Sequence, residues 1–441
     1  MIPADFSEGL ASALLDGAWS SSELESRARV ALGSRPRWLR PLCARVLASF
    51  PEPPAETRSL ALHLEQDARL AAALKRAGRM PRIRRWFLPE PRMAARPVAL
   101  ASIALPPIDR LGTLADMLSL SPAQLAWFAD VRGLNAARAS EQLSHYHYRW
   151  VAKRSGGYRL LETPKLRIKR MQRWLLRELL SHVPPEPSAH GFVPRRSVLS
   201  FVADHVGKAV VLRLDLEDFF ATIAVARVHA LFARLGYPHT VAQTLAGLCC
   251  VATPEAILRA NPEPDPSERH RAAQRLRIPH LPQGAPTSPA LSNLVAWRLD
   301  RRLSGLARAL GLSYSRYADD LAFSGERTLL RRSTRFVVRA GAIALEEGFR
   351  LRYRKLRVMP HTGRQHLAGL IINARPNVPR RDYDALRATL HNAIQHGPDS
   401  QNRTGHPDFR AQLEGRITWI AQTNQLRATR LRTLFDRIHW P

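Results

Sequence analysis

The sequence is poor in cysteine, in acidic residues and in long apolar runs, and each shortage excludes a class of protein. Three cysteines among 441 residues, none in a CxxC pair, support neither a disulfide framework nor a zinc site. The longest stretch without formal charge, 235–254, is interrupted by Gly, Pro, His, Gln and Thr and cannot span a bilayer. Asp5 and Glu8 near the start do not fit a signal peptide. We therefore expect a soluble, cytoplasmic protein that does not enter a membrane.

The shortage of acidic residues leaves a large positive charge. The chain has 37 Asp and Glu against 67 Lys and Arg, a formal net charge of +30. An excess of this size costs self-repulsion unless a polyanion screens it. Nucleic acid is the first candidate partner and an anionic membrane surface the second, and the third interpretation is a fold that merely has a basic surface.

Hydrophobic periodicity divides the chain into a helical beginning, a mixed middle and a basic helical end. Residues 1–82 are predicted to be helical, with Pro-rich breaks at 51–54 and 89–107. Ser121-Pro-Ala-Gln has the residues of a helix start with a capping box. The other expected elements are a hairpin at 148–161, a helix at 165–181, a strand at 210–216, a helix after Pro289, a hairpin at 313–323 and helices after Arg380.

Two acidic motifs each end a hydrophobic strand, where a carboxylate is unfavourable unless something binds it. The first ends at Asp215, and the second is Tyr317-Ala-Asp-Asp320, with Asp319 and Asp320 in a tight turn. Neighbouring aspartates repel each other, and a pair of divalent cations removes that cost. Mg²⁺ prefers hard carboxylate oxygens, and two such ions form a clamp for phosphoryl displacement. The motifs predict a site for two Mg²⁺ ions, with Mn²⁺ as the alternative.

Taken together with other blocks, these motifs resemble the bacterial retron-type reverse transcriptases. The blocks follow the order of that family between about 145 and 391, more than half of the chain. They are Lys153-Arg-Ser-Gly-Gly-Tyr-Arg159, Ala189-His-Gly-Phe192, Asp215 with Phe219-Phe220, Leu281-Pro-Gln-Gly-Ala-Pro-Thr-Ser-Pro-Ala-Leu-Ser-Asn293, Tyr317-Ala-Asp-Asp320, Gly348-Phe-Arg-Leu with Lys355, and His366-Leu-Ala-Gly-Leu-Ile-Ile-Asn373.

The resemblance implies catalytic roles for four residues. Asp215 and Asp319 would bind both metal ions, with Asp320 beside them. Lys355 is a candidate proton donor to the leaving pyrophosphate, and simple charge on a solvated loop is the alternative for this residue.

The resemblance also implies a nucleotide-binding set. Lys153 and Arg159 would neutralise the incoming triphosphate. Phe220 would exclude a ribose 2′-hydroxyl by shape. Because neighbours on an extended segment point to opposite faces, we expect Phe219 to be buried where Phe220 is not. Gln283 and Gly284 would let the backbone approach the nascent base pair.

The fold implied by this resemblance is an α+β, right-hand polymerase with a helical N-terminal extension. Its expected parts are an extension with a basic Pro-rich linker at 1–107, fingers at 108–208, a palm at 209–375 and a helical thumb at 376–441. Two family elements are altered: Phe201-Val-Ala-Asp-His205 stands where Asn-Ala-x-x-His is usual, and Leu367-Ala-Gly369 where Val-Thr-Gly is usual. These changes bear on RNA recognition and on strict membership of the retron branch, not on the polymerase chemistry.

The expected activity is RNA-directed DNA synthesis from dNTPs. By resemblance, the template is a structured noncoding RNA from the same locus, the products are an RNA–DNA hybrid and single-stranded DNA, and the setting is antiviral defence with room for an accessory effector protein. One alternative is another bacterial reverse transcriptase, either like those of group II introns or of an unassigned defence type. A second is a non-catalytic RNA-binding scaffold, which the three intact aspartates disfavour.

Overall fold

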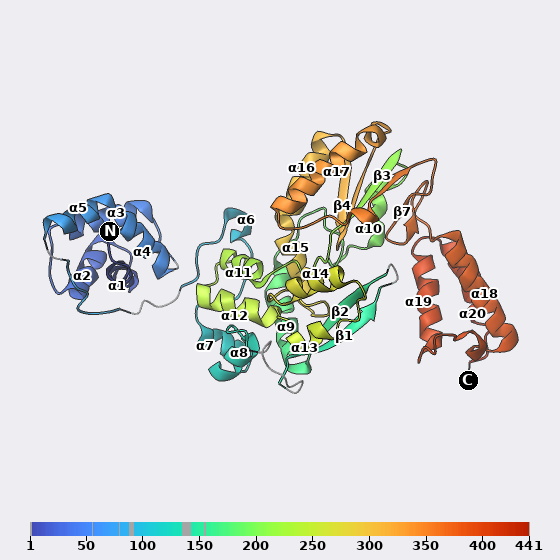
Figure 1. Ribbon diagram of the computed structural model, residues 1–441, viewed down its shortest axis with the longest axis horizontal. Coiled ribbons are helices and arrows are strands. Elements are labelled where there is room, and N and C mark those ends of the chain that lie inside the picture. Colours follow the sequence, from blue (N-terminus) through green and yellow to red (C-terminus); the bar gives the residue numbers. More distant parts are fainter. Residues whose placement is uncertain are drawn as a thin grey trace. The chain divides into compact units, whose positions relative to one another are not determined.

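The computed structural model describes residues 2–54, 56–78, 80–87, 92–134, 143–153 and 156–440. By its contacts the chain forms two compact units. Unit 1 comprises Met1–Val183 with Ala224–Thr287, and unit 2 comprises Pro184–Ile223 with Ser288–Pro441. Both units contain helices and β-strands, which confirms the α+β class (Figure 1). Among the described residues, no helix has the length and apolarity that crossing a bilayer requires.

The first part of unit 1 is a bundle of short helices, as the periodicity predicts. Its core consists of leucines from all five helices together with Phe6, Cys43 and Val46, all nearly inaccessible to solvent. The helices are α1 (Ala4–Leu15), α2 (Ser21–Leu32), α3 (Leu39–Ser49), α4 (Thr57–Gln66) and α5 (Ala68–Arg76).

The rest of unit 1 contains a β-hairpin and further helices. Strand β1 (Tyr146–Ala152) pairs antiparallel with β2 (Tyr158–Pro164), so the predicted hairpin is confirmed, although Arg154 and Ser155 of its expected turn lie outside the described residues. The capping box at Ser121 and Gln124 is also confirmed. The helices are α6 (Val98–Ala101), α7 (Leu111–Met117), α8 (Pro122–Ala129), α9 (Leu166–Glu178), α11 (Val225–Arg234), α12 (His239–Cys249), α13 (Glu255–Arg259) and α14 (Pro266–Leu276).

Unit 2 is built on an antiparallel sheet in the order β4-β5-β3-β6. The strands are β4 (Ser313–Tyr317), β5 (Asp320–Gly325), β3 (Val210–Asp215) and β6 (Arg357–Pro360), and a two-stranded ribbon is formed by β7 (His366–Leu367) and β8 (Leu370–Ile371). The helices of this unit are α10 (Val198–Val202), α15 (Ser288–Val295), α16 (Trp297–Ala309), α17 (Thr328–Glu346), α18 (Arg380–His396), α19 (Phe409–Ala421) and α20 (Gln425–Phe435). The helix expected after Pro289 is two helices, because it is interrupted at Ala296.

Different elements pack against the two faces of this sheet. On one face, Phe323 of β5 packs edge-on against Phe336 of α17, with ring centroids 4.8 Å apart. On the other, Val211 and Ala322 belong to a core with Phe201 and with apolar residues of α18, α19 and α20. Side chains alternate along a strand, so residues 213, 215 and 320 share the face of Val211 and Ala322. The carboxylates of Asp215 and Asp320 therefore lie on the face opposite α17.

Candidate active site

The β-ladder brings the three predicted acidic residues together at one end of the sheet. Asp215, the last residue of β3, stands directly opposite Asp320, the first residue of β5. Asp319 precedes Asp320 in the β4–β5 turn, and its carbonyl accepts a hydrogen bond of 2.8 Å from the Leu216 amide. Ala318 completes this turn with φ of 54°, a left-handed conformation that non-glycine residues rarely adopt. Asp215 and Asp320, which are 105 positions apart in the chain, thus converge because the strands pair in this register.

Three cations contact two of these carboxylates. The Nε of Arg352 lies 3.7 Å from Oδ1 of Asp215. The Lys355 ammonium donates to Oδ2 of Asp215 at 2.6 Å. The Arg213 guanidinium binds Asp320 in a bidentate manner, at 2.9 and 3.0 Å. Among the described residues, no Lys or Arg forms an ion pair with Asp319. Burial, followed by the charges of Asp215 and Asp320, raises the pKa of Asp319 to about 6. The crowding of negative charge expected from the sequence is therefore present.

The donor set fits a hard divalent cation. All three groups supply carboxylate oxygens, and Oδ1 of Asp215 is buried without a hydrogen-bond partner. As the described side chains stand, no three His, Cys, Asp or Glu groups are arranged to hold one metal ion. Asp215 instead contacts Lys355, and Asp320 contacts Arg213.

A buried arginine supports the turn, and sequence reasoning missed it. Arg316 is fully buried and binds Asp300, also fully buried, through Nε at 2.8 Å and Nη2 at 2.6 Å. Its Nη1 donates to the Ala318 carbonyl and to Oδ1 of Asn293, both at 3.0 Å. Arg316 therefore connects the β4–β5 turn to α15 and α16. Its position in Tyr-Ser-Arg-Tyr, inside a buried strand, was the available signal.

The Ala189-His-Gly-Phe192 block contacts the same turn. The Gly191 carbonyl accepts from Nδ2 of Asn293 at 2.8 Å, and the Ala189 backbone bridges that of Arg316. A Cβ on Gly191 would stand 2.5 Å from the Ala318 amide nitrogen, closer than real contacts allow. Only glycine fits here, so this block sets the position of the turn.

His205, the one residue kept from the altered Phe201–His205 element, has a structural role inside the sheet. It is fully buried, with Nδ1 2.7 Å from the Ser324 hydroxyl and Nε2 2.7 Å from the Ser315 hydroxyl. It thereby connects the two strands of the β4–β5 hairpin. Burial is the main cause that lowers its pKa to about 3. The His205 imidazole is therefore neutral in the folded protein.

We expect His205 to make stability fall with acidification. Its pKa is lower in the folded chain than the ordinary 6.5, so its contribution is complete above pH 6.5 and is lost as pH falls toward 3. Between about pH 7.5 and about pH 5.5 the loss is roughly 1.4 kcal/mol. Urea unfolding at both pH values gives the change in the free energy of unfolding for the wild type and for His205→Gln. The difference between these two changes is the contribution of His205. Equal pH dependences in the two proteins would contradict the assignment.

The two adjacent phenylalanines have different environments, although the reason predicted from the sequence is wrong. Phe219 is buried against Phe349, whereas Phe220 is half-buried beside Phe192, with ring centroids 6.1 Å apart. Both lie in turns after β3 and not on an extended segment, so strand alternation does not separate them. Asp218, directly before the pair, has a left-handed backbone conformation with φ of 45°.

The predicted nucleotide-binding residues outside the sheet belong to unit 1. Lys153 and Arg159 lie at the turn end of the β1–β2 hairpin, where the Lys153 amide donates to the Gly157 carbonyl at 2.8 Å. The Gln283 carbonyl accepts from the Glu162 amide of β2 at 3.0 Å. Gly284 has φ of 138°, and a Cβ there would be 3.0 Å from the Glu162 carbonyl. The hairpin and the Gln283–Gly284 loop are thus packed together.

A buried ion pair stands behind that loop. Glu162 and His280 are each 1% exposed, and Nε2 of His280 lies 3.0 Å from a Glu162 carboxylate oxygen. The other Glu162 oxygen accepts from Thr253 at 2.7 Å, and Nδ1 of His280 faces the Ile278 carbonyl at 2.7 Å. Although burial opposes it, the Glu162 charge raises the pKa of His280 above its ordinary value. This pair positions the loop and was not found from the sequence, because its members are 118 residues apart.

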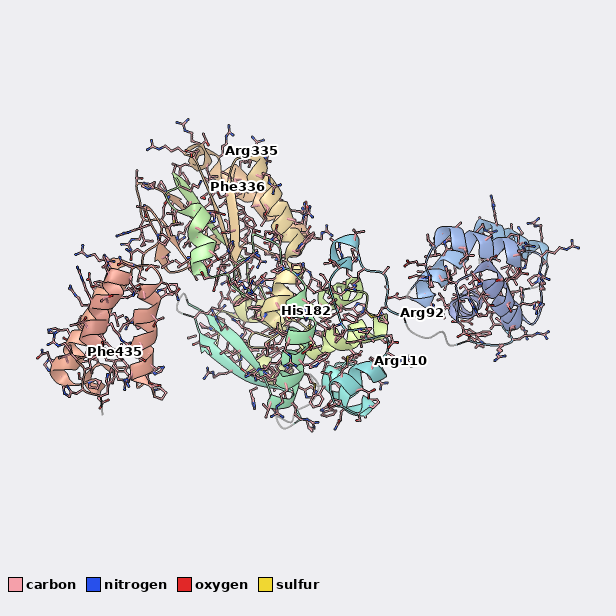
Figure 2. The ribbon with its side chains drawn as sticks, turned by 180° about the vertical axis from the view of Figure 1, so that it is seen from behind. Arg92, Arg110, His182, Arg335, Phe336 and Phe435 are labelled. Carbon is pink, nitrogen blue, oxygen red and sulfur yellow. The ribbon has the colours of Figure 1, made fainter. Side chains whose placement is uncertain are left out.

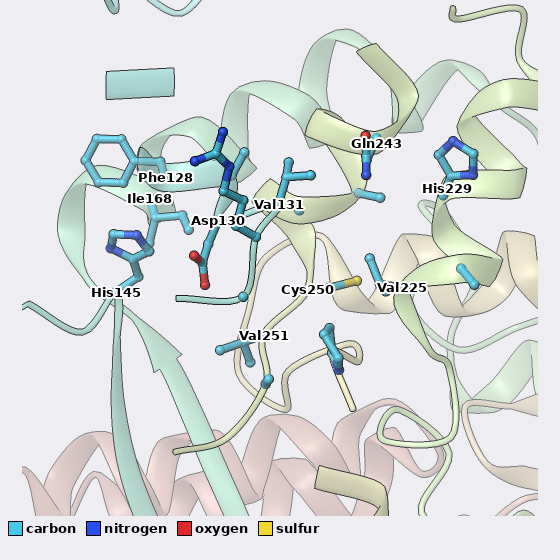
Figure 3. A pocket seen from close by; sticks show the side chains of 18 of the residues that line it. Phe128, Asp130, Val131, His145, Ile168, Val225, His229, Gln243, Cys250 and Val251 are labelled. Carbon is cyan, nitrogen blue, oxygen red and sulfur yellow. The ribbon is translucent and has the colours of Figure 1, made fainter. Parts of the chain in front are cut away.

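Unit 1 also contains a cavity of about 380 Å³, lined by residues of unit 1 alone. Figure 3 shows Phe128, Asp130 and His145 on one side of it and His229 and Gln243 on the other. Asp130 is the one acidic residue among its described lining. The cavity therefore lacks the paired carboxylates that distinguish the end of the sheet in unit 2.

Comparison with known proteins relates the part of the chain that contains the three aspartates to one family. Residues 151–368 match the family model described as reverse transcriptase (RNA-dependent DNA polymerase). The chain is 41% identical over 305 residues to the retron Mx65 reverse transcriptase of Myxococcus xanthus, covering 68% of this chain and 66% of that protein. It is 34% identical over 331 residues to the retron Mx162 reverse transcriptase of the same species, covering 72% and 64%. Against the retron Ec86 reverse transcriptase of Escherichia coli it is 30% identical over 238 residues, covering 53% and 64%. The chain thus spans just under two thirds of the length of each.

Proposed function

Because the chain belongs to the bacterial retron-type reverse transcriptases, we propose that it is an RNA-directed DNA polymerase. The observation that carries the proposal is the convergence of Asp215, Asp319 and Asp320 at one end of an antiparallel sheet. Members of the family use divalent metal ions, and here we propose two Mg²⁺ held by these carboxylates. When bound, such ions neutralise charge on the transferring phosphoryl group.

Individual residues then have distinct tasks. Lys355, 2.6 Å from Asp215, would supply a proton to the departing pyrophosphate from inside the site. Lys153 and Arg159 would bind the triphosphate of the incoming dNTP. Gln283 and Gly284 would support the nascent base pair through the backbone, since the loop carries no bulk at Gly284.

The proposed architecture is that of a right hand. We assign fingers to 108–208, a palm to 209–375 and a helical thumb to 376–441, after an extension at 1–107. The template is proposed to be a structured noncoding RNA encoded beside the gene. The products are an RNA–DNA hybrid and single-stranded DNA that serve antiviral defence, with an effector protein as the further partner.

Primer extension on the full-length protein tests the polymerase. A DNA primer annealed to a heteropolymeric RNA template is incubated with four dNTPs and Mg²⁺, in parallel with a DNA template of the same sequence. We expect full-length complementary DNA from the RNA template, and none when the metal is chelated. A preparation that is folded and binds the primer–template but adds no nucleotide, with Mg²⁺ or with Mn²⁺, would favour the non-catalytic scaffold.

Phe220 is expected to determine the choice of sugar. Its half-buried ring follows Asp215 by five residues, so Phe220→Ala should open space for a 2′-hydroxyl. Discrimination between dGTP and GTP should narrow by about 10- to 100-fold, the scale of roughly 1–3 kcal/mol for small steric pockets. Single-nucleotide incorporation measures the ratio.

Phe192→Ala is the matched control, because this ring touches Phe220 and is 47% exposed. It should leave the ratio within about twofold of wild type, since only Phe220 is assigned to the sugar. Phe219→Ala should instead lower the free energy of unfolding by about 3–5 kcal/mol, as a buried cavity does. An unchanged dGTP/GTP ratio in folded Phe220→Ala rules out the steric role.

A further inference from the structure

Helix α17 carries a row of arginines that the proposed polymerase site does not use. Arg331, Arg332, Arg335 and Arg339 are exposed, and no salt bridge among the described residues includes any of them. The single acidic residue of α17, Glu346, is at the far end of the helix and pairs with Arg302. The row therefore presents four positive charges without local compensation.

The row occupies one side of the helix. At 3.6 residues per turn, the four positions fall within an arc of about 100°, and Arg331 and Arg339 are about 12 Å apart along the axis. The opposite side of α17 is buried through Leu329, Phe336 and Ala340. Figure 2 shows Arg335 at the outer edge of unit 2 and Phe336 inside it. The guanidinium groups thus extend into solvent from a helix that is fixed by its core side.

This side of the unit faces away from the carboxylates. Phe336 of α17 packs on Phe323, three residues after Asp320, so the helix covers the other face of the sheet. Phosphates bound by the arginine row therefore lie behind the sheet and not against Asp215 or Asp320. An interaction there is separate from the site of synthesis.

We propose that the arginine row binds the sugar–phosphate backbone of an RNA duplex, as a second nucleic-acid surface. Guanidinium forks match phosphate geometry, and contacts to the backbone carry no sequence requirement. Single strands are bound with exposed aromatic side chains, and the only aromatic residue of α17 is the buried Phe336. We therefore take the double-stranded stem of a folded RNA template as the ligand of the arginine row. The inference rests on the proposed function only in taking structured RNA as the partner.

A lipid surface is the competing class, and the side chains disfavour it. Membrane-binding helices present a continuous apolar face with a basic one. The exposed apolar residues of α17, Leu330, Val338 and Leu345, lie on one side of the helix but two turns apart. Thr334 and Gly341 lie between them, so they do not form a continuous apolar face. Its continuous apolar side is already buried against the sheet.

The test compares two variants that lose the same charge. One replaces Arg331, Arg332, Arg335 and Arg339 by Gln, and the control replaces four exposed arginines of the N-terminal bundle, Arg29, Arg40, Arg69 and Arg76, by Gln. The probe is a blunt RNA stem-loop of about 16 base pairs without a primer end. Fluorescence anisotropy gives its affinity at several salt concentrations, and vesicles of phosphatidylcholine with phosphatidylserine form a parallel arm. Primer extension at saturating primer–template is measured on all three proteins.

We expect the α17 variant to bind the stem-loop at least about tenfold more weakly, with the log–log salt slope reduced by about 2–3, while the control stays close to wild type. Its maximal extension rate should be unchanged. Equal losses in both variants, no loss in either, or a loss confined to vesicle binding would each overturn the proposal. A wild type that binds the stem-loop as expected but extends no primer would refute the polymerase and leave the arginine surface standing.

Discussion

Asp319→Asn is expected to reduce dNTP incorporation at least about 1,000-fold, which corresponds to roughly 4 kcal/mol of transition-state stabilisation. The substitution keeps the shape of the side chain and removes one of the three charges that we propose hold the metal ions. Stability should not fall, because the pKa of Asp319 is raised to about 6 by burial and by its acidic neighbours. Removing a charge that is disfavoured in the folded state relieves repulsion. Loss of activity in a protein that is at least as stable is the signature of a metal-binding role.

Asp218→Asn is the matched control for this prediction. Asp218 follows Asp215 by three residues and is engaged by Nη2 of Arg352 at 2.9 Å, so it is an acidic neighbour to which no metal role is assigned. We expect less than about a tenfold effect on incorporation there. Thermal unfolding and primer extension are measured on both variants. Extension by Asp319→Asn above about a thousandth of wild type counts against the assignment.

Features with a local signature could be predicted from the sequence. The capping box at Ser121, the β1–β2 hairpin and the β4–β5 turn each depend on residues within a few positions of one another, and all three were predicted correctly. The convergence of Asp215 with Asp320 was also predictable, because Asp215 ends one short apolar strand and Asp320 begins another after the acidic turn.

Contacts that depend on the tertiary approach of distant segments could not be predicted. His205 looks like an isolated polar residue in the sequence, and only strand pairing places Ser315 and Ser324 on either side of its ring. His205 therefore has a structural role, and the effect of the altered element on RNA recognition stays a prediction. The ion pair of Lys355 with Asp215 is likewise formed across 140 residues.

Arg316→Met is expected to lower the free energy of unfolding of unit 2 by about 3–5 kcal/mol. The guanidinium is fully buried, and its loss would leave the fully buried Asp300 carboxylate without a counter-charge. Tyr314 would still donate to Asp300 at 2.8 Å, which does not neutralise the charge. Thermal and urea unfolding measure the loss.

The double variant Asp300→Leu with Arg316→Met separates the contribution of Arg316 to stability from its positioning of the β4–β5 turn. Replacing a buried ion pair by apolar residues is often neutral, so most of the lost stability should return. Activity should not return, because the Ala318 carbonyl and Asn293 would both still lack the Nη1 donor that holds the β4–β5 turn. We expect primer extension to remain at least about tenfold below wild type even where the double variant is fully folded, since misplacing a catalytic group by about 1 Å costs on the order of 100-fold. Recovery of both stability and extension would mean that Arg316 only balances the charge of Asp300 and that the strands β4 and β5 hold the turn unaided.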